Sequence, residues 1–321
     1  MNVSRREFLL GSGAAAIATM TLSARAELRP LVLSPIRDGN ARKVLCLSEL
    51  EIDVGATVPF RVLHVSDSHL NLWDVADIAG DQPLGEKFAR RWVRFPQAVN
   101  SFCALLDYAG ANRLPILHTG DLMDANTAAN ARFASRSLKS VDFFYAIGNH
   151  EYQLAAGNQD PATCRARLRQ VVGNGLTVAS RIENGINFVA YDNGMVNLRP
   201  ETVERVKSEF ARGLPVVLLC HIPPKYTEKF LDNSLESKRQ TLRGQGAGVA
   251  EIARIARGRN IEEAYDATTS AFYVWLRQQR QLKAILCGHT HVEEDDVFSE
   301  TARMYVAGGG FEGRGRIIAF R

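Results

Sequence analysis

The chain has 321 residues, of which 46% are hydrophobic and 23% are charged, and its formal net charge is +4. These values are typical of a globular protein and exclude disordered and collagen-like chains. A chain of this length can bury a substantial core, so the fold does not need disulfides or a metal to hold a small scaffold together. The five cysteines are odd in number and widely spaced, and their pattern predicts no disulfide.

The N-terminus has the pattern of an export signal. The twin arginine Arg5-Arg6 precedes 17 uncharged residues, rich in glycine, serine, threonine and alanine, at positions 8–24. This pattern predicts a twin-arginine signal peptide over residues 1–26 that is cleaved after Ala26. The alternative is a membrane anchor, but a span needs about 20 predominantly apolar residues, so we expect no stable membrane anchor. The predicted export partner is the twin-arginine translocase, and the predicted location is the periplasm or the medium.

The charge of the remaining chain points to no nucleic-acid partner. Removal of residues 1–26 takes away three arginines and one glutamate and leaves a net charge of +2. Basic and acidic residues are interleaved, whereas a nucleic-acid-binding surface is usually a clustered basic face. We expect residues 27–321 to form a single domain.

Short apolar runs rich in β-branched residues predict buried strands. They lie at residues 60–66, 115–119, 143–147, 186–191, 215–220, 284–287, 303–307 and 317–320. Helix-like stretches lie at 96–109, 161–172, 200–211 and 266–282, and the first three begin with proline, which suits a first helical turn. This alternation predicts an α/β fold with mixed sheets. The long interval 222–283, which includes helical periodicity, predicts a helical lid or specificity insert.

Polar residues that can bind metals follow five of the predicted strands. They are Asp67 and His69, then Asp121 and Asp124, then Asn149 and His150, then His221, and finally His289 and His291. Functional groups gather beyond the carboxyl ends of strands in α/β sheets, so a single shared site explains all five loops. Gly120, Gly148 and Gly288 stand at strand exits, where a tight turn or a close backbone approach favours a residue without Cβ.

This set of side chains favours divalent metal ions. Aspartate, histidine and asparagine without thiolates suit Mn, Fe, Zn or Co rather than a cysteine-rich structural zinc site. The ligands are too many for one ion. Two ions about 3.5 to 4 Å apart that share one carboxylate would use them all, and such a pair can hold the attacking and leaving oxygens of a phosphoryl group. The candidate shared ligand is Asp121.

In chain order these residues form five short motifs. They are Asp-x-His at 67–69, Gly-Asp-x-x-Asp at 120–124, Gly-Asn-His-Glu at 148–151, His221, and Gly-His-x-His at 288–291. The ordered set resembles the calcineurin-like metallophosphoesterase family. The resemblance implies a two-sheet sandwich flanked by helices, in α-β-β-α order. It also implies hydrolysis of phosphate esters by a metal-bridging hydroxide. We expect the substrate to be a small-molecule or lipid-derived phosphomonoester or phosphodiester.

The resemblance further implies a role for each site residue. One ion would be held by Asp67, His69, Asp121 and His291, and the other by Asp121, Asn149, His221 and His289. His150 would bind the phosphate or protonate the leaving oxygen, and Asp124 would orient His150 by hydrogen bonding. Glu151 would have a supporting role. His64 and His118 lie within predicted strands, where we expect them to be core histidines.

Two other functions are compatible with the motifs. A nuclease or nucleic-acid phosphodiesterase would use the same chemistry, but the net charge of +2 after cleavage argues against it. A metal-binding scaffold without turnover would keep the same fold, but the presence of both His150 and Asp124 argues against it. We therefore expect an enzyme.

Overall fold

The computed structural model describes residues 45–74, 77, 85–86, 89, 94–154, 157–158, 160–224 and 265–321. The predicted signal peptide at 1–26 lies outside these residues, and so does the segment 225–264 of the predicted insert. Within the described ranges, no helix combines the length and the apolar composition needed to span a membrane.

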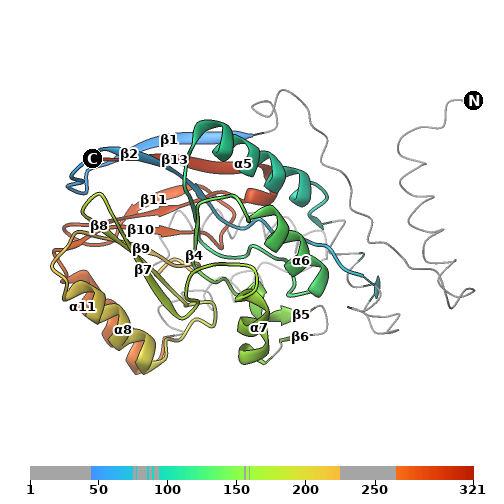
Figure 1. Ribbon diagram of the computed structural model, residues 1–321. Helices are drawn as coiled ribbons and strands as arrows, with labels where there is room; N and C mark the ends of the chain where they lie inside the picture. Colours follow the sequence, from blue (N-terminus) through green and yellow to red (C-terminus); the bar gives the residue numbers. More distant parts are fainter. Residues whose placement is uncertain are drawn as a thin grey trace, which may run out of the picture. The chain divides into compact units, whose positions relative to one another are not determined.

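Two β-sheets form the centre of the described structure (Figure 1). The first has five strands, in the order β1 (Cys46–Ile52), β13 (Arg314–Phe320), β2 (Phe60–Val65), β3 (Ile116–His118) and β4 (Phe143–Tyr145). The second has six, in the order β11 (Glu294–Val297), β12 (Arg303–Val306), β10 (Leu282–Cys287), β9 (Val216–Leu219), β8 (Ile186–Tyr191) and β7 (Val178–Glu183). A short hairpin of β5 (Gln153–Leu154) and β6 (Gly157–Asn158) follows β4.

The strand directions determine where the connecting loops lie. Strands β2, β3 and β4 are parallel to one another, and so are β8, β9, β10 and β12. The edge strands β7 and β11 are antiparallel to their neighbours. Since parallel strands end at the same edge of a sheet, the loops after β2, β3 and β4 share one edge, and those after β8, β9 and β10 share another.

The main core lies between the two sheets. Val62 and Phe144 of the first sheet pack in one buried cluster with Phe188 and Leu219 of the second. All six residues of β8 and all four of β9 are buried, because these central strands are covered on both faces. Strands of this kind are nearly continuous in apolar residues, which is why the sequence predicts them.

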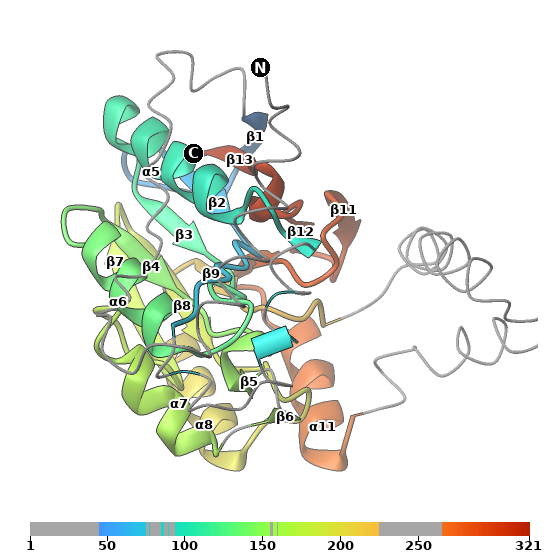
Figure 2. The ribbon, with the colours of Figure 1, turned by 90° about the vertical axis from the view of Figure 1, so that its right-hand side faces the viewer.

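Helices cover the outer face of each sheet. Helix α5 (Ala98–Asn112) packs on the first sheet, and α6 (Ala128–Ser137) and α7 (Pro161–Leu168) pack around Tyr145 of β4. Helices α8 (Pro200–Phe210) and α11 (Ala267–Arg277) lie side by side on the second sheet (Figures 1 and 2). The layers are therefore helix, sheet, sheet and helix, and the predicted fold class is confirmed.

Side chains at the helix starts satisfy free backbone N–H groups. The carboxylate of Asp160 accepts from the Thr163 N–H at the start of α7, and that of Asp266 accepts from the Thr269 N–H at the start of α11. The predicted helix over 266–282 is wrong at its end, because α11 stops at Arg277. Leu282 instead begins β10, where it pairs with Val216.

The strands absent from the prediction lie at sheet edges or alternate in exposure. In β1 and β7 buried or half-buried residues alternate with more exposed ones, and β11 is mostly acidic. Edge strands bury less surface and often carry charges, so they have no continuous apolar run. Helix α6 was also not predicted, since it is rich in alanine and polar residues, and its start depends on Thr127, whose side chain accepts from the Asn130 N–H.

Candidate metal centre

The structure brings all the predicted site residues together at strand ends. Asp67 and His69 follow β2, Asp121 and Asp124 follow β3, Asn149 and His150 follow β4, His221 follows β9, and His289 and His291 follow β10. Three of these strands belong to the first sheet and two to the second. The residues form two groups with one aspartate between them.

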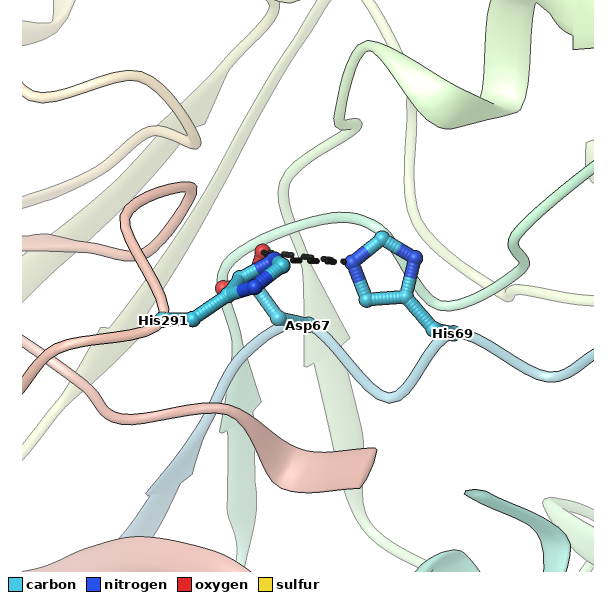
Figure 3. Close-up of side chains that lie close together, drawn as sticks. All are labelled: Asp67, His69 and His291. Carbon is cyan, nitrogen blue, oxygen red and sulfur yellow. Dashed lines mark hydrogen bonds and ion pairs between the residues drawn. The ribbon is translucent and has the colours of Figure 1, made fainter. Parts of the chain in front are cut away.

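The first group contains Asp67, His69 and His291, which point toward one another (Figure 3). His291 Nε2 lies 3.3 Å from Asp67 Oδ1 and 3.0 Å from His69 Nε2. His69 Nε2 is 3.7 Å from the same Asp67 oxygen. Three potential ligand atoms from two sheets therefore converge on one point.

The second group contains Asp121, His221 and His289, together with Asn149. The Oδ1 atom of Asn149 lies 3.1 Å from His221 Nε2 and 2.9 Å from His289 Nδ1. His221 Nδ1–H donates to the backbone carbonyl of Thr119 at 2.7 Å. That hydrogen bond leaves Nε2 of His221 as the atom that can bind a metal.

Asp121 lies between the two groups. Its Oδ2 is 3.1 Å from His221 Nε2 in the second group and 3.7 Å from His69 Nε2 in the first. Its side chain is almost completely buried, with the residue 1% exposed. A carboxylate in this position can be shared by two cations.

His150 and Asp124 lie beside the groups. His150 Nδ1–H donates to the backbone carbonyl of Asp124 at 2.9 Å, and the same nitrogen is 3.2 Å from Asp124 Oδ1. Asp124 Oδ1 is also 3.3 Å from Nδ1 of His69, a contact that was not predicted. His150 Nε2 is 3.9 Å from Asp121 Oδ2, so His69, Asp121 and His150 make a third, overlapping group of potential ligands.

The donor atoms fit divalent cations better than they satisfy one another. In the second group, His221 Nε2 and His289 Nδ1 are only 3.2 Å apart. Asp67 Oδ1 is buried and has no hydrogen-bond donor in suitable geometry. A buried acceptor without a donor is costly, and facing imidazole lone pairs repel unless a proton or a cation lies between them. The chemistry of the donors, imidazole and carboxylate without thiolate, suits Mn, Fe, Zn or Co.

In the metal-free protein, protonated histidines partly neutralise the buried carboxylates of the site. Burial alone would lower the pKa of His221, but the Asp121 carboxylate raises it to about 10. Likewise, burial opposes charge on His69, but the neighbouring carboxylates of Asp124 and Asp67 raise its pKa to about 9. The pKa of His289 is lowered to about 3, first by burial and then by the charge of His221.

The backbone of the ligand loops has an uncommon conformation. Five of the proposed ligands have a positive φ, namely Asp67 (55°), His69 (45°), Asp121 (51°), His289 (72°) and His291 (62°). Residues other than glycine rarely adopt this left-handed region, and each such residue costs about 1–3 kcal/mol. Backbone hydrogen bonds between loops hold two of them, from Asp67 N–H to Gly120 and from His69 N–H to Asp121, each at 2.9 Å.

Two glycines allow the loops to approach one another. Gly120 has a φ of +93°, and a Cβ there would lie 2.6 Å from His221 Nδ1. A Cβ on Gly288 would lie 1.7 Å from Ser66 Oγ and 2.4 Å from Asp67 Oδ2. The expectation that these strand exits need residues without Cβ is confirmed at both positions.

The two predicted core histidines, His64 and His118, are buried beneath the ligand loops, at the ends of β2 and β3. His64 and His118 are fully buried, and burial is the main reason that their pKa values are lowered to about 3. His118 Nδ1 accepts from the Gly120 N–H at 3.3 Å, so its Nε2–H donates to Ser68 Oγ at 2.9 Å. His118 thus connects the loops after β2 and β3.

Several residues of the site were not predicted. The ring of Phe95 stacks on His69 with centroids 4.5 Å apart, and Phe311 lies 5.0 Å from His291 in the same measure. Asn193, which follows β8, bonds to the backbone of His221. Neither phenylalanine stands in a motif, but Asn193 could have been found, since it is another polar residue at the end of a predicted strand.

A model of the family described as calcineurin-like phosphoesterase matches residues 60–293. A search of curated proteins found no match. Similar solved structures include a dimetal phosphatase from Danio rerio, 14% identical, covering 79% of this chain and 88% of that chain, with a TM-score of 0.46.

Two further structures have similar coverage of this chain. A 5'-nucleotidase from Candida albicans is 13% identical, covers 78% of this chain and 46% of that chain, and has a TM-score of 0.37. A phosphopantetheinyl hydrolase from Mycobacterium tuberculosis is 13% identical, covers 82% of this chain and 91% of that chain, and has a TM-score of 0.35.

Proposed function

The chain belongs to the calcineurin-like phosphoesterase family, and we propose that it binds two divalent metal ions. As a member of this family it is a hydrolase of phosphoric ester bonds. One ion would be held by Asp67, His69, Asp121 and His291, and the other by Asp121, Asn149, His221 and His289. The observation that carries this proposal is the position of Asp121 Oδ2, 3.1 Å from His221 Nε2 and 3.7 Å from His69 Nε2.

The chemistry divides between the ions and His150. Two bound divalent ions supply a nucleophile at neutral pH and positive charge for the phosphoryl oxygens. His150 donates its Nδ1–H to the Asp124 carbonyl, so its Nε2 is the atom that can contact a phosphoryl oxygen or give a proton to the leaving oxygen. The side chain of His150 is 18% exposed, so substrate can reach it.

We propose a small-molecule or lipid-derived phosphomonoester or phosphodiester as the substrate. The net charge of +2 without residues 1–26 supports a small substrate over nucleic acid. The half-buried ring of Phe311 beside the first group supports an organic leaving group.

The test is reconstitution of the metal-free protein with Mn, Fe, Zn or Co. Each form is assayed with p-nitrophenyl phosphate and bis-p-nitrophenyl phosphate, and the bound metal is counted by elemental analysis. We expect hydrolysis and two ions per chain. If no metal gives hydrolysis, the proposed enzymatic activity is contradicted. If the active protein holds about one ion per chain, the two-ion site is contradicted.

We also propose that the chain is exported by the twin-arginine translocase. The support is the Arg5-Arg6 pair ahead of the uncharged stretch at 8–24. Replacement of both arginines by lysine should keep the protein in the cytoplasm of a bacterial host, as measured by cell fractionation. Export that is unaffected by this change, or that continues in a host without the translocase, would contradict the proposal.

A further inference from the structure

One polar strand end lies outside the five motifs. The segment Asp192-Asn193-Gly194 directly follows β8. Because β8 is parallel to β9 and adjacent to it, its carboxyl end lies beside the loop that carries His221. Asn193 is only 2% exposed, so its amide needs hydrogen-bond partners inside the protein.

Both ends of the Asn193 amide bind the backbone next to His221. Its Oδ1 accepts from the N–H of His221 at 3.0 Å and from the N–H of Ile222 at 3.1 Å. Its Nδ2 donates to the carbonyl of Ile222 at 2.7 Å. Three hydrogen bonds from one side chain therefore fix the backbone from which the His221 side chain starts.

A separate hydrogen bond holds the ring of His221. Its Nδ1–H donates to the Thr119 carbonyl at 2.7 Å, which directs Nε2 toward Asp121 and Asn149. Thr119 fixes the rotation of the ring, and Asn193 fixes the backbone to which the ring is attached. A shift of either one would move Nε2 away from the other donor atoms.

The same loop also contacts the backbone at Asn149. A Cβ on Gly194 would lie 2.7 Å from the carbonyl oxygen of Gly148 and 3.1 Å from the backbone N of Asn149. The segment 192–194 thus touches the chain at two residues that we assign to the same ion. No atom of Asn193 is itself a donor to that ion in our assignment.

We propose that Asn193 is a positioning residue for the ion held by Asp121, Asn149, His221 and His289. This inference rests on the proposed two-ion function. Mutation of a residue that orients a metal ligand typically lowers metal affinity about 10- to 100-fold. We therefore expect loss of Asn193 to weaken the binding of that ion by about the same factor. The binding of the other ion, held by Asp67, His69, Asp121 and His291, should be unaffected.

Three variants separate this role from general stability. Asn193→Ala removes all three hydrogen bonds, whereas Asn193→Asp keeps an acceptor for the two N–H groups and replaces the donor to Ile222 by a carboxylate oxygen. Asn187→Ala is the matched control, because Asn187 is a fully buried asparagine in β8, the strand before Asn193, and its side chain donates to Glu209 at 3.1 Å. We expect the affinity of Asn193→Asp to lie between those of the wild type and Asn193→Ala.

The first measurement is a stepwise Mn²⁺ titration of the metal-free full chain by calorimetry, with electron paramagnetic resonance to detect coupled Mn²⁺ pairs. The second is amide hydrogen exchange at His221 and Ile222 in the metal-free protein. In Asn193→Ala we expect weaker binding of one ion, loss of the coupled signal at a concentration that saturates the wild type, and faster exchange at both amides. We expect Asn187→Ala to match the wild type in all three.

The outcomes distinguish this proposal from the proposed function. If Asn193→Ala binds both ions like the wild type, or if Asn187→Ala loses as much affinity, the positioning role is overturned and the two-ion function stands. If the wild type binds fewer than two ions, the two-ion function is contradicted, and so is the role of Asn193 in it. Unchanged exchange at His221 in Asn193→Ala overturns the positioning role in either case.

Discussion

His150 lies farther from the shared carboxylate of Asp121 than His69 and His221 do. Its Nδ1 faces Asp124, and its Nε2 is 3.9 Å from the nearest Asp121 oxygen, farther than His221 Nε2 at 3.1 Å. We predict that His150→Ala lowers kcat by about 100- to 10,000-fold, the range for loss of a general acid, and leaves the metal content unchanged. Steady-state kinetics and elemental analysis on one sample check this prediction.

Two results would remove this assignment. Equal hydrolysis by the wild type and His150→Ala would show that His150 takes no part in the reaction. A variant that loses one metal ion would instead make His150 a ligand, as the overlapping group of His69, Asp121 and His150 allows.

Gly288 offers a test of packing at a single residue. The Cβ of an alanine there would lie 1.7 Å from Ser66 Oγ and 2.4 Å from Asp67 Oδ2, so Asp67 must move. We predict that Gly288→Ala destabilises the fold by about 1–3 kcal/mol, typical of overpacking, and weakens metal binding. Urea unfolding of the metal-free protein measures the first effect.

Gly110 is the matched control for this substitution. It lies in α5, and a Cβ there would have nothing within 4 Å. Since alanine is favoured over glycine in a helix, Gly110→Ala should stabilise the fold by about 0.5–1 kcal/mol. Equal unfolding free energies for Gly288→Ala and the wild type would contradict the close packing of the loops after β2 and β10.

At the scale of elements, Glu151 joins the loops after β3 and β4. Its buried carboxylate accepts from the N–H groups of Gly148 (2.8 Å), Asp121 (3.1 Å) and Met123 (3.0 Å). Glu151→Ala would leave three buried donors without an acceptor, and each costs about 1–3 kcal/mol. We predict a loss of at least about 3 kcal/mol in unfolding free energy, with a smaller loss for Glu151→Gln, which keeps one acceptor oxygen. A Glu151→Gln variant as stable as the wild type would show that packing, and not hydrogen bonding, is the role of Glu151, because glutamine keeps the volume of the side chain and loses one acceptor oxygen.

The elements that the sequence predicts and those it does not differ in burial. The central strands β8 and β9 are buried along their whole length and were predicted from continuous apolar runs. The edge strand β11 has the sequence EDDV and an alternating exposure, and no apolar run marks it. Its pairing with β12 depends on tertiary contact, which is why local sequence did not predict it.

At the scale of the molecule, the proposed ligands come from both sheets. Asp67, His69, Asp121 and Asn149 lie on loops of the first sheet, and His221, His289 and His291 lie on loops of the second. Cations bound between them would connect the two sheets. Ligands that bind only the native state stabilise it, by about 4 kcal/mol at a concentration 1,000 times Kd, so chelation should lower Tm.

The pKa values of the site predict how metal binding depends on pH. His69 and His221, with pKa values raised to about 9 and about 10, are protonated in the metal-free protein at neutral pH, and metal binding must release these protons. The apparent affinity should therefore rise with pH until about 9 to 10. Calorimetry in buffers of different ionisation enthalpy measures the proton release. An affinity that is constant between pH 6 and 8 would contradict it.

The protonated His69 and His221 make the stability of the metal-free fold decrease with rising pH, whereas metal affinity increases. Stabilisation from protonated His69 and His221 is complete below their ordinary pKa of 6.5 and is lost as the pH rises through about 9 and 10. His64 and His118, with pKa values lowered to about 3, favour the fold above pH 6.5, and their contribution is lost as the pH falls toward 3. The metal-free protein should thus lose stability at both extremes.

The sequence by itself determined the motifs, the family resemblance and the central strands, because these depend on residue types in short, ordered segments. The tertiary structure alone decided that Asp121 lies between two groups of ligands, and that Asn193 holds the backbone of His221. The physical reason is that these contacts join residues far apart in the chain. The hydrogen bond between Thr119 and His221, for example, spans 102 residues and exists only where the edges of the two sheets meet.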